Sequence, residues 1–311
     1  MNCARQRDEL DTRSYGAAMH RDHHLMPIVV ALAGVAFLSL MDAFMKVAAL
    51  AAGAYSAALL RSAFGTAIAA PIWLARGARW PGAEALRFHL IRGVVSAFMA
   101  LTFFYAITKL PLAETIAISF IAPVISLYLA AIILKEKIHR LAVVAAVLGL
   151  IGTIVIVGGR IGAEAMSRDT LLGVAAILFS AVLYAYNLVL ARQQAMVAGP
   201  LEIASFHSGV GALVLSLAAP WLFQWPETVA LANILAASVL TVCGAIALAW
   251  AYARAEAQVL VPLEYSGFLW AVLFGYLFFS EAVTPATLAG TVLIVIGCWI
   301  AARKRPEISA V

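Results

Sequence analysis

The chain has 311 residues, of which 64% are hydrophobic and only 12% are charged, and its mean hydropathy is +0.98. Soluble globular domains are about 45–50% apolar and about 25% charged, so this composition excludes a cytosolic enzyme, a disordered protein and a nucleic-acid-binding domain. The net charge of +5 comes from basic residues that lie between apolar runs. The three cysteines have no paired spacing and predict neither a disulfide framework nor a zinc site.

Long apolar runs follow one another along the whole chain. A helix that crosses a bilayer needs about 20 mostly apolar residues. Ten runs meet this requirement: 27–50, 54–75, 86–108, 112–134, 139–158, 170–190, 201–223, 229–253, 257–279 and 284–302. The runs are continuous rather than alternating, which excludes the strands of a membrane barrel. The sequence therefore predicts an all-α integral membrane protein with ten transmembrane helices.

The basic residues predict how the chain is oriented. Residues 1–26 hold four arginines and three histidines but no apolar run, so we expect a disordered tail. If this tail is cytoplasmic, fifteen Lys and Arg residues fall on the inner side and three on the outer side. Such a bias is the positive-inside rule. We therefore expect both termini, including the C-terminal tail 304–311, to be cytoplasmic.

The two halves of the chain match each other at an offset of 145 residues. This offset pairs Glu136 with Glu281, Ala145 with Gly290, and Gly152 with Gly297. The repeats predicted in this way are residues 27–158 and 159–303. Each repeat holds five spans, an odd number, so the second repeat is inverted in the membrane. Inverted repeats are typical of transporters that alternate access around a site near the midplane.

The paired residues are expected to serve the scaffold. Glu136 and Glu281 each come just before an apolar helix, where a carboxylate complements the helix dipole and caps free amides. Small residues seven apart in the fifth and tenth spans, such as Gly152 and Gly290 with their partners Ala145 and Gly297, let those two helices approach closely.

The first-half stretch FFYAITKLPLAETIAISFIAPVISLYLAAIILKEKI, with Tyr105, Pro123 and Glu136, resembles the signature of the EamA family of the drug/metabolite transporter superfamily. The second half departs from this pattern, because Phe268 stands where a proline is usual. The resemblance implies a small-molecule transporter in a bacterial-type inner (plasma) membrane. Within the family, the chain is similar to bacterial aromatic amino-acid exporters, and riboflavin-type carriers are nearly as close.

Ionisable side chains inside spans are costly in lipid and therefore point to function. Asp42 and Lys46 lie four residues apart in the first span and can form an ion pair that meets an amino-acid zwitterion. Arg61 lies at a similar depth in the second span and can complete a triad. His207 can titrate near neutral pH, and Glu264 can bind an ammonium group or a proton. The alternatives are a self-neutralised pair, a histidine satisfied by a neighbouring helix, and an acid that reaches the interface.

Three other ionisable residues favour a structural interpretation. His89 and Arg92 lie near the start of the third span, where long side chains reach the interface at little cost. Glu114 opens the fourth span after Pro111 and is expected to complement the dipole of that helix.

Aromatic and amide side chains inside the spans indicate the kind of solute. The candidates are Tyr105, Tyr184, Asn187, Trp250, Tyr252, Tyr265 and Trp270. A mid-membrane indole such as that of Trp270 needs a partner for its N–H. Aromatic walls with a few polar groups favour a pocket for a flat, amphipathic solute, although helix packing explains any single residue as well.

These observations predict a secondary transporter that exports small organic metabolites, foremost aromatic and other apolar amino acids, by alternating access around a central cavity. The alternatives are a carrier of another metabolite, such as riboflavin or a nucleotide-type solute, and an intramembrane enzyme. No GxxxxGK[ST] or HExxH motif is present, and we expect no cofactor, metal or nucleic-acid partner. The carboxylates and the histidine allow proton coupling.

Overall fold

The computed structural model describes residues 3–77, 79–133, 140–163, 167–252 and 266–302, and every regular element within them is a helix. The helices are α1 (Cys3–Ala52), α2 (Ala54–Ala75), α3 (Ala83–Lys109), α4 (Leu112–Ser119), α5 (Ile121–Ile133), α6 (Arg140–Ala163), α7 (Arg168–Ala195), α8 (Pro200–Ser216), α9 (Ala219–Leu222), α10 (Thr228–Tyr252), α12 (Gly267–Phe279) and α13 (Pro285–Ala302). Each predicted span therefore contains at least one described helix. Glu136 lies outside the described residues.

Two ends of the bundle serve as references. At the Gly53 end, α1 turns into α2 at Gly53, which has a φ of 80°, α3 turns into α4, and α12 turns into α13. At the opposite, Trp80 end, α2 connects to α3 and α7 connects to α8. Trp80 is 76% exposed there, and Trp221 and Trp225 are similarly exposed toward the Gly53 end, as expected of indoles at membrane interfaces.

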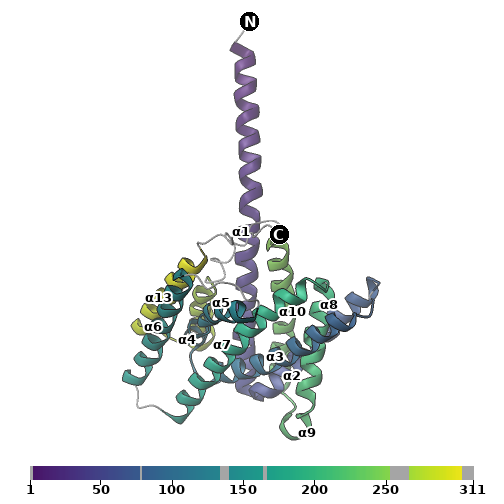
Figure 1. Ribbon diagram of the computed structural model, residues 1–311, viewed down its shortest axis with the longest axis vertical. Coiled ribbons are helices and arrows are strands. Elements are labelled where there is room, and N and C mark those ends of the chain that lie inside the picture. The colour runs from purple at the N-terminus through teal and green to yellow at the C-terminus, as the bar shows by residue number, and fades with distance from the viewer. Residues whose placement is uncertain (1–2, 78, 134–139, 164–166, 253–265, 303–311) are drawn as a thin grey trace.

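Helix α1 is much longer than the first predicted span. It begins at Cys3 and projects beyond the bundle, with the N-terminus far from the other helices (Figure 1). This continuous helix differs from the disordered tail that was expected for residues 1–26. The stretch 3–26 contains no proline and several strong helix formers, such as Ala4, Leu10 and Met19, so α1 continues through it.

The helix contacts show the inverted repeat. Helix α1 packs against α10, and its counterpart α7 packs against α3, the counterpart of α10. Helices α6 and α13 correspond to each other and pack together at one edge of the bundle, as do α2 and α8 at the other (Figure 1). The α1–α10 and α7–α3 contacts are therefore equivalent, and the α6–α13 and α2–α8 contacts each join a helix to its own counterpart. Two inverted five-helix halves require this pattern.

The small-residue faces of α6 and α13 bring their backbones together. A Cβ on Gly152 would lie 2.5 Å from the Gly290 carbonyl oxygen, and a Cβ on Gly290 would lie 2.5 Å from that of Gly152. A Cβ on Gly159 would lie 2.2 Å from the Cβ of Ala286. The close approach predicted from the sequence is confirmed, because no side chain fits between the two helices at these positions.

Prolines divide two of the predicted spans. The fourth span breaks at Phe120, whose N–H bonds to Ala117 rather than four residues back. Pro123 follows, and its ring lacks an N–H and clashes with the carbonyl of the preceding turn. The seventh span breaks in the same way between α8 and α9, ahead of Pro220.

The outer surface is apolar, as a lipid-facing surface must be. Large exposed side chains include Leu74, Leu213, Ile246, Leu269 and Leu277. Among the described residues, five helical segments are long and apolar enough to cross a membrane unaided: Met26–Ala52, Ala54–Ala75, Ala83–Lys109, Arg168–Ala191 and Thr228–Leu248. Shorter apolar helices such as Gly267–Phe279 complete the bundle.

The α6–α13 contact can be tested by replacing glycine with alanine at two positions of α6, one inside the contact and one outside it. We expect Gly152→Ala to lower the melting temperature of the detergent-solubilised protein, because overpacking costs about 1–3 kcal/mol. Gly158→Ala on the same helix meets nothing within 4 Å and is the matched control. It should leave the melting temperature unchanged or raise it, because alanine favours a helix more than glycine does. Equal melting temperatures for the two variants would contradict the packing.

Candidate functional site

Two opposite charges face each other near the middle of the membrane. Asp42 lies ten residues before the end of α1, and Arg61 lies seven residues after the start of α2. At 1.5 Å per residue these positions are about 10–15 Å below the Gly53 end, in a hydrocarbon core about 30 Å thick. The two groups interact electrostatically, but no salt bridge joins them among those of the described side chains.

The Arg61 guanidinium is held without a carboxylate partner in contact. Its central carbon lies 5.2 Å from the centre of the Phe104 ring on α3. Its Nε is buried and has no hydrogen-bond partner. A guanidinium stacked on an aromatic ring retains its planar fork of donors. Arg61 can therefore donate hydrogen bonds to an anionic group that enters between α1, α2 and α3.

His207 adds a second unpartnered nitrogen. It lies on α8, and its Nδ1 is buried without a hydrogen-bond partner. It interacts electrostatically with both Arg61 and Arg92. Such polar atoms are rare in a folded interior. Two such atoms on side chains that interact electrostatically indicate a place where a ligand can supply the missing hydrogen-bond partners.

Arg92 is the second arginine of this region, and amides hold it. Its Nε donates to the Asn187 side-chain oxygen at 2.9 Å, and its Nη1 donates to the side-chain oxygen of Gln194. Ser96 also donates to the Asn187 oxygen, at 3.1 Å. Tyr184, one turn before Asn187 on α7, interacts electrostatically with Arg92. The expectation that Arg92 extends to the interface is therefore wrong, because α7 offers it acceptors inside the bundle.

Lys46 does not form its salt bridge with Asp42. It is 4% exposed, and its ammonium group forms a salt bridge with Glu281 and donates to the Leu110 carbonyl at 2.9 Å. The Phe279 ring centre lies 4.8 Å from the same nitrogen. The i,i+4 pair suggested by the sequence is replaced because the α12–α13 turn brings a carboxylate to Lys46 from another helix.

Glu281 connects three parts of the Gly53 end. Ser280 has a φ of 55° and ends α12. The Glu281 side chain accepts from Lys46 and, at 2.7 Å, from the N–H of Leu112 at the start of α4. Glu281 therefore caps a helix, as expected, but that helix is α4 rather than α13. Thr284 caps α13 by accepting from the Thr287 N–H at 3.1 Å. These contacts close the Gly53 end between α1, α4 and α12.

Glu114 is also drawn into the contacts between the halves. It lies in the first turn of α4, as predicted, and is 2% exposed. It accepts a hydrogen bond from the Thr287 hydroxyl of α13 at 3.3 Å. Its place in the first turn suits the helix dipole, and its partner ties the first repeat to the second.

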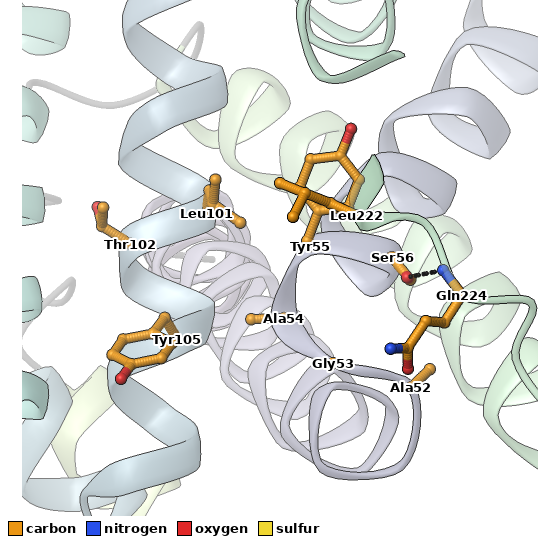
Figure 2. Close-up of a pocket in the computed structure, with 10 residues that line it drawn as sticks. All are labelled: Ala52, Gly53, Ala54, Tyr55, Ser56, Leu101, Thr102, Tyr105, Leu222 and Gln224. Atoms are coloured by element: carbon orange, nitrogen blue, oxygen red, sulfur yellow. Dashed lines mark hydrogen bonds between the residues drawn. The ribbon is translucent and has the colours of Figure 1, made fainter. Parts of the chain in front are cut away.

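A pocket of about 430 Å³ opens at the Gly53 end. Figure 2 shows Leu101, Thr102 and Tyr105 of α3 across this pocket from Ser56 and Gln224. The Gln224 N–H donates to the Ser56 hydroxyl at 2.9 Å, and the Tyr55 hydroxyl donates to the Leu215 carbonyl. Tyr105, predicted to contact substrate, thus lines a pocket nearer the membrane surface than Asp42 and Arg61.

The other predicted aromatic residues fall in different places. Trp270 is half-buried on α12 and stacks on Phe274 at 6.0 Å. Ser39 of α1 donates to the Gly267 carbonyl of α12 at 3.4 Å. Both helices end at the Gly53 end, and Asp42 and Trp270 each lie three residues further along them, so these two residues lie at similar depths. Trp250 packs against Ala31, near the start of the first predicted span, and Ala251. Glu264, Tyr265 and the side chain of Tyr252 lie outside the described residues.

Two polar residues of the Trp80 end were missed in the sequence. Gln194 is 1% exposed near the end of α7, and Glu202 lies in the first turn of α8. Both bond to His89, which is 0% exposed and therefore does not reach the interface as expected. The amide of Gln194 beside an apolar run could have indicated a buried polar contact. Its partner His89 could not be identified from the sequence, because it lies 105 residues away in the chain.

Two segments of the chain, residues 25–158 and 171–303, match the EamA-like transporter family. This chain belongs to that family, and the two matches divide it as the internal repeat does. It is a membrane-embedded transporter of small molecules rather than an enzyme. The family resemblance and the all-α membrane fold expected from the sequence are confirmed.

Two relatives and a solved structure show the range of similar proteins. The chain is 28% identical to the pseudopaline exporter CntI of Pseudomonas aeruginosa, over 89% of this chain and 96% of the relative. It is 26% identical to an S-adenosylmethionine uptake transporter of Rickettsia conorii, over 67% and 68% of the two chains. A crystal structure of 21% identity superposes with a TM-score of 0.61 over 88% of this chain and 96% of that chain, which shows a shared fold.

The Lys46–Glu281 salt bridge should contribute strongly to stability. Glu281→Gln leaves a buried lysine without its carboxylate, and removing one partner of a buried pair costs about 3–5 kcal/mol. We expect a clear drop in the melting temperature measured in detergent. Glu227→Gln, at an exposed position of the same end, is the control and should melt like the parent. The double variant Lys46→Met with Glu281→Gln should regain part of the loss, and a double variant as unstable as Glu281→Gln would contradict the pairing.

Proposed function

We propose that this transporter exports zwitterionic metabolites, foremost amino acids with aromatic or other apolar side chains. The observation that carries the proposal is the charge imbalance near the midplane. Arg61 and Arg92 have aromatic or amide partners, and Asp42 is the acid that interacts with Arg61. Unmatched charge is costly inside a membrane. A substrate carboxylate on Arg61 and a substrate ammonium group on Asp42 would offset that cost.

The side chains around this site suit an apolar solute. Phe104 lies beneath Arg61, and α12 presents Trp270 and Phe274 at about the level of Asp42. Tyr55 and Tyr105 line the pocket toward the Gly53 end. Aromatic surfaces with few polar groups are typical of pockets for flat, amphipathic molecules. These features support aromatic amino acids, and they also support the alternative of riboflavin or a nucleotide-type solute.

Alternating access is the mechanism that the inverted repeat supports. In the proposed orientation both termini are cytoplasmic in a bacterial inner membrane, so the Gly53 end faces outward. The Lys46–Glu281 contacts then close the outer side, and they must open for a solute to leave. The relatives include an exporter and an uptake transporter, so export is proposed from the resemblance to amino-acid exporters, whereas the charge bias supports only the orientation of the chain. Asp42 offers a place for a coupling proton.

The charge-matching site is tested by counterflow into proteoliposomes with labelled phenylalanine. Asp42→Asn and Arg61→Gln should each lower uptake about tenfold or more, because a hydrogen bond to a charged group contributes about 1.5–3 kcal/mol. Glu84→Gln, at an exposed position of α3, is the control. Competition with phenethylamine and with 3-phenylpropionate should separate the two roles. Loss of Asp42 should spare inhibition by the acid, and loss of Arg61 should spare inhibition by the amine.

Parental uptake by both variants would place the substrate elsewhere. The same assay with riboflavin and a nucleotide sugar tests the alternative solutes. A signal for either of these without one for any amino acid would replace the proposed substrate and leave the fold untouched.

The aromatic residues provide an independent prediction. Tyr105→Ala and Trp270→Ala should lower uptake several-fold without lowering the amount of folded protein in the membrane, as judged by size-exclusion chromatography. Trp80→Ala, at an exposed interface position, is the control. Normal uptake by both variants would show that neither α3 near its end nor α12 contacts the solute.

A further inference from the structure

A chain of hydrogen-bonded side chains crosses the Trp80 end of the bundle. Arg92 donates to the Gln194 side-chain oxygen, and the Gln194 amide nitrogen lies 2.6 Å from Nδ1 of His89. Nε2 of His89 lies 2.8 Å from the Glu202 carboxylate. We call Arg92, Gln194, His89 and Glu202 the His89 network. It joins α3 to α7 and to α8.

The obligatory donor at one end determines every hydrogen bond in this network. An arginine has no acceptor, so the Gln194 oxygen must face Arg92. The Gln194 nitrogen therefore faces His89 and donates to Nδ1. Nδ1 must then carry a lone pair, and the ring proton lies on Nε2, which donates to Glu202. In this arrangement His89 is neutral.

A second proton on His89 is incompatible with this arrangement. In an imidazolium both ring nitrogens are donors, so Nδ1–H would face the N–H group of Gln194. Gln194 cannot resolve the conflict by turning over, because its nitrogen would then face the Arg92 guanidinium. The proton adds to the Nδ1 lone pair, and Nε2–H remains bonded to Glu202. Protonation therefore breaks the His89–Gln194 bond between α3 and α7 and preserves the His89–Glu202 bond between α3 and α8.

The surroundings of His89 allow it to bind a proton. Among the described side chains, the charged groups that face it are Glu202 from α8, which favours the imidazolium, and Arg92 from its own helix, which opposes it through Gln194. Helix α2 reaches the site with Trp73, which packs on Phe206, and Phe206 stacks on the imidazole at 4.5 Å. The Glu202 side chain is 19% exposed and that of His89 is 0% exposed, so Glu202 borders the aqueous side.

We propose that the His89 network is a proton-binding site, and that a proton on His89 favours opening of the Trp80 end of the bundle by weakening the contact between α3 and the end of α7. Arg92 and Asn187 connect this network to the midplane site. Proton binding is therefore linked to access for the solute. The transport consequence rests on the proposed function, whereas the opening itself does not.

A cysteine placed behind the network reports the opening without any substrate. Leu190 on α7 is 4% exposed and lies three residues after Asn187 and four before Gln194, on the face of α7 that bonds to Arg92 of α3. In a protein whose native cysteines are replaced by alanine, Leu190→Cys can be labelled by a water-soluble maleimide when α7 moves away from α3 at this end. Labelling is compared at about pH 5.5 and about pH 7.5. The reaction of free cysteine with the maleimide at each pH corrects for thiolate reactivity.

Three variants in this background test the role of the proton. The corrected labelling rate should rise several-fold at the lower pH with the network intact. His89→Gln, which cannot take up the proton, should remove this rise. Gln194→Glu should also remove it, because a carboxylate accepts from both Arg92 and Nδ1–H and so holds the charged ring. Gln193→Glu, the same change one residue earlier on α7, should behave as the parent.

Glu202→Gln gives the inference a second, graded test. It retains an acceptor for Nε2–H but removes the charge that favours the imidazolium, so the rise in labelling should shift to lower pH. An undiminished rise in His89→Gln or Gln194→Glu would overturn the inference. If His89→Gln does not fold, Gln194→Glu with its Gln193→Glu control decides alone. Pyranine-detected proton movement during counterflow tests the coupling. Labelling that depends on His89 without amino-acid counterflow would overturn the proposed solute, and counterflow with pH-independent labelling would overturn the His89 site.

Discussion

Placing charged groups in hydrocarbon is the constraint on which the rest of this structure depends. Lys46, Arg61 and Arg92 lie within apolar spans, where each charge is costly unless other groups compensate for it. The protein compensates them in different ways. Lys46 has a carboxylate from the α12–α13 turn, Arg92 has amides from α7, and Arg61 has the Phe104 ring and the more distant Asp42. Full pairing of Lys46 joins α1, α4 and the α12–α13 turn at the Gly53 end, and incomplete pairing of Arg61 identifies the candidate solute site.

This division of roles fits the way a transporter of this family must work. Contacts that close one end have to be strong enough to exclude ions and weak enough to break in each cycle. The Lys46–Glu281 contacts join α1, α4 and α12, and the His89 network joins α3, α7 and α8. The two sets lie at opposite ends and connect different helices. The tight α6–α13 contact, where Gly152 meets Gly290, holds the two halves together beside them.

Much of the fold could be predicted because bilayer thickness and backbone hydrogen bonding restrict the choices. Continuous apolar runs specified helices, the odd number of spans per half specified inversion, and Pro123 explains why the fourth span is divided. The site was less predictable. Asp42 and Arg61 were recognised because charge inside a span is rare, whereas Lys46 was assigned to its helical neighbour. A local spacing cannot reveal that Glu281, 235 residues away, lies nearer.

The sequence by itself determined the membrane class, the number of spans, the internal repeat and the family resemblance, because these depend on local apolar length and on residues adjacent in the chain. The tertiary structure decided which charges meet. It paired Lys46 with Glu281, capped α4 from the second repeat, and buried His89 between Gln194 and Glu202. These outcomes depend on helix packing, which brings distant turns together, and on the direction of each hydrogen bond, which is set by an arginine that can only donate.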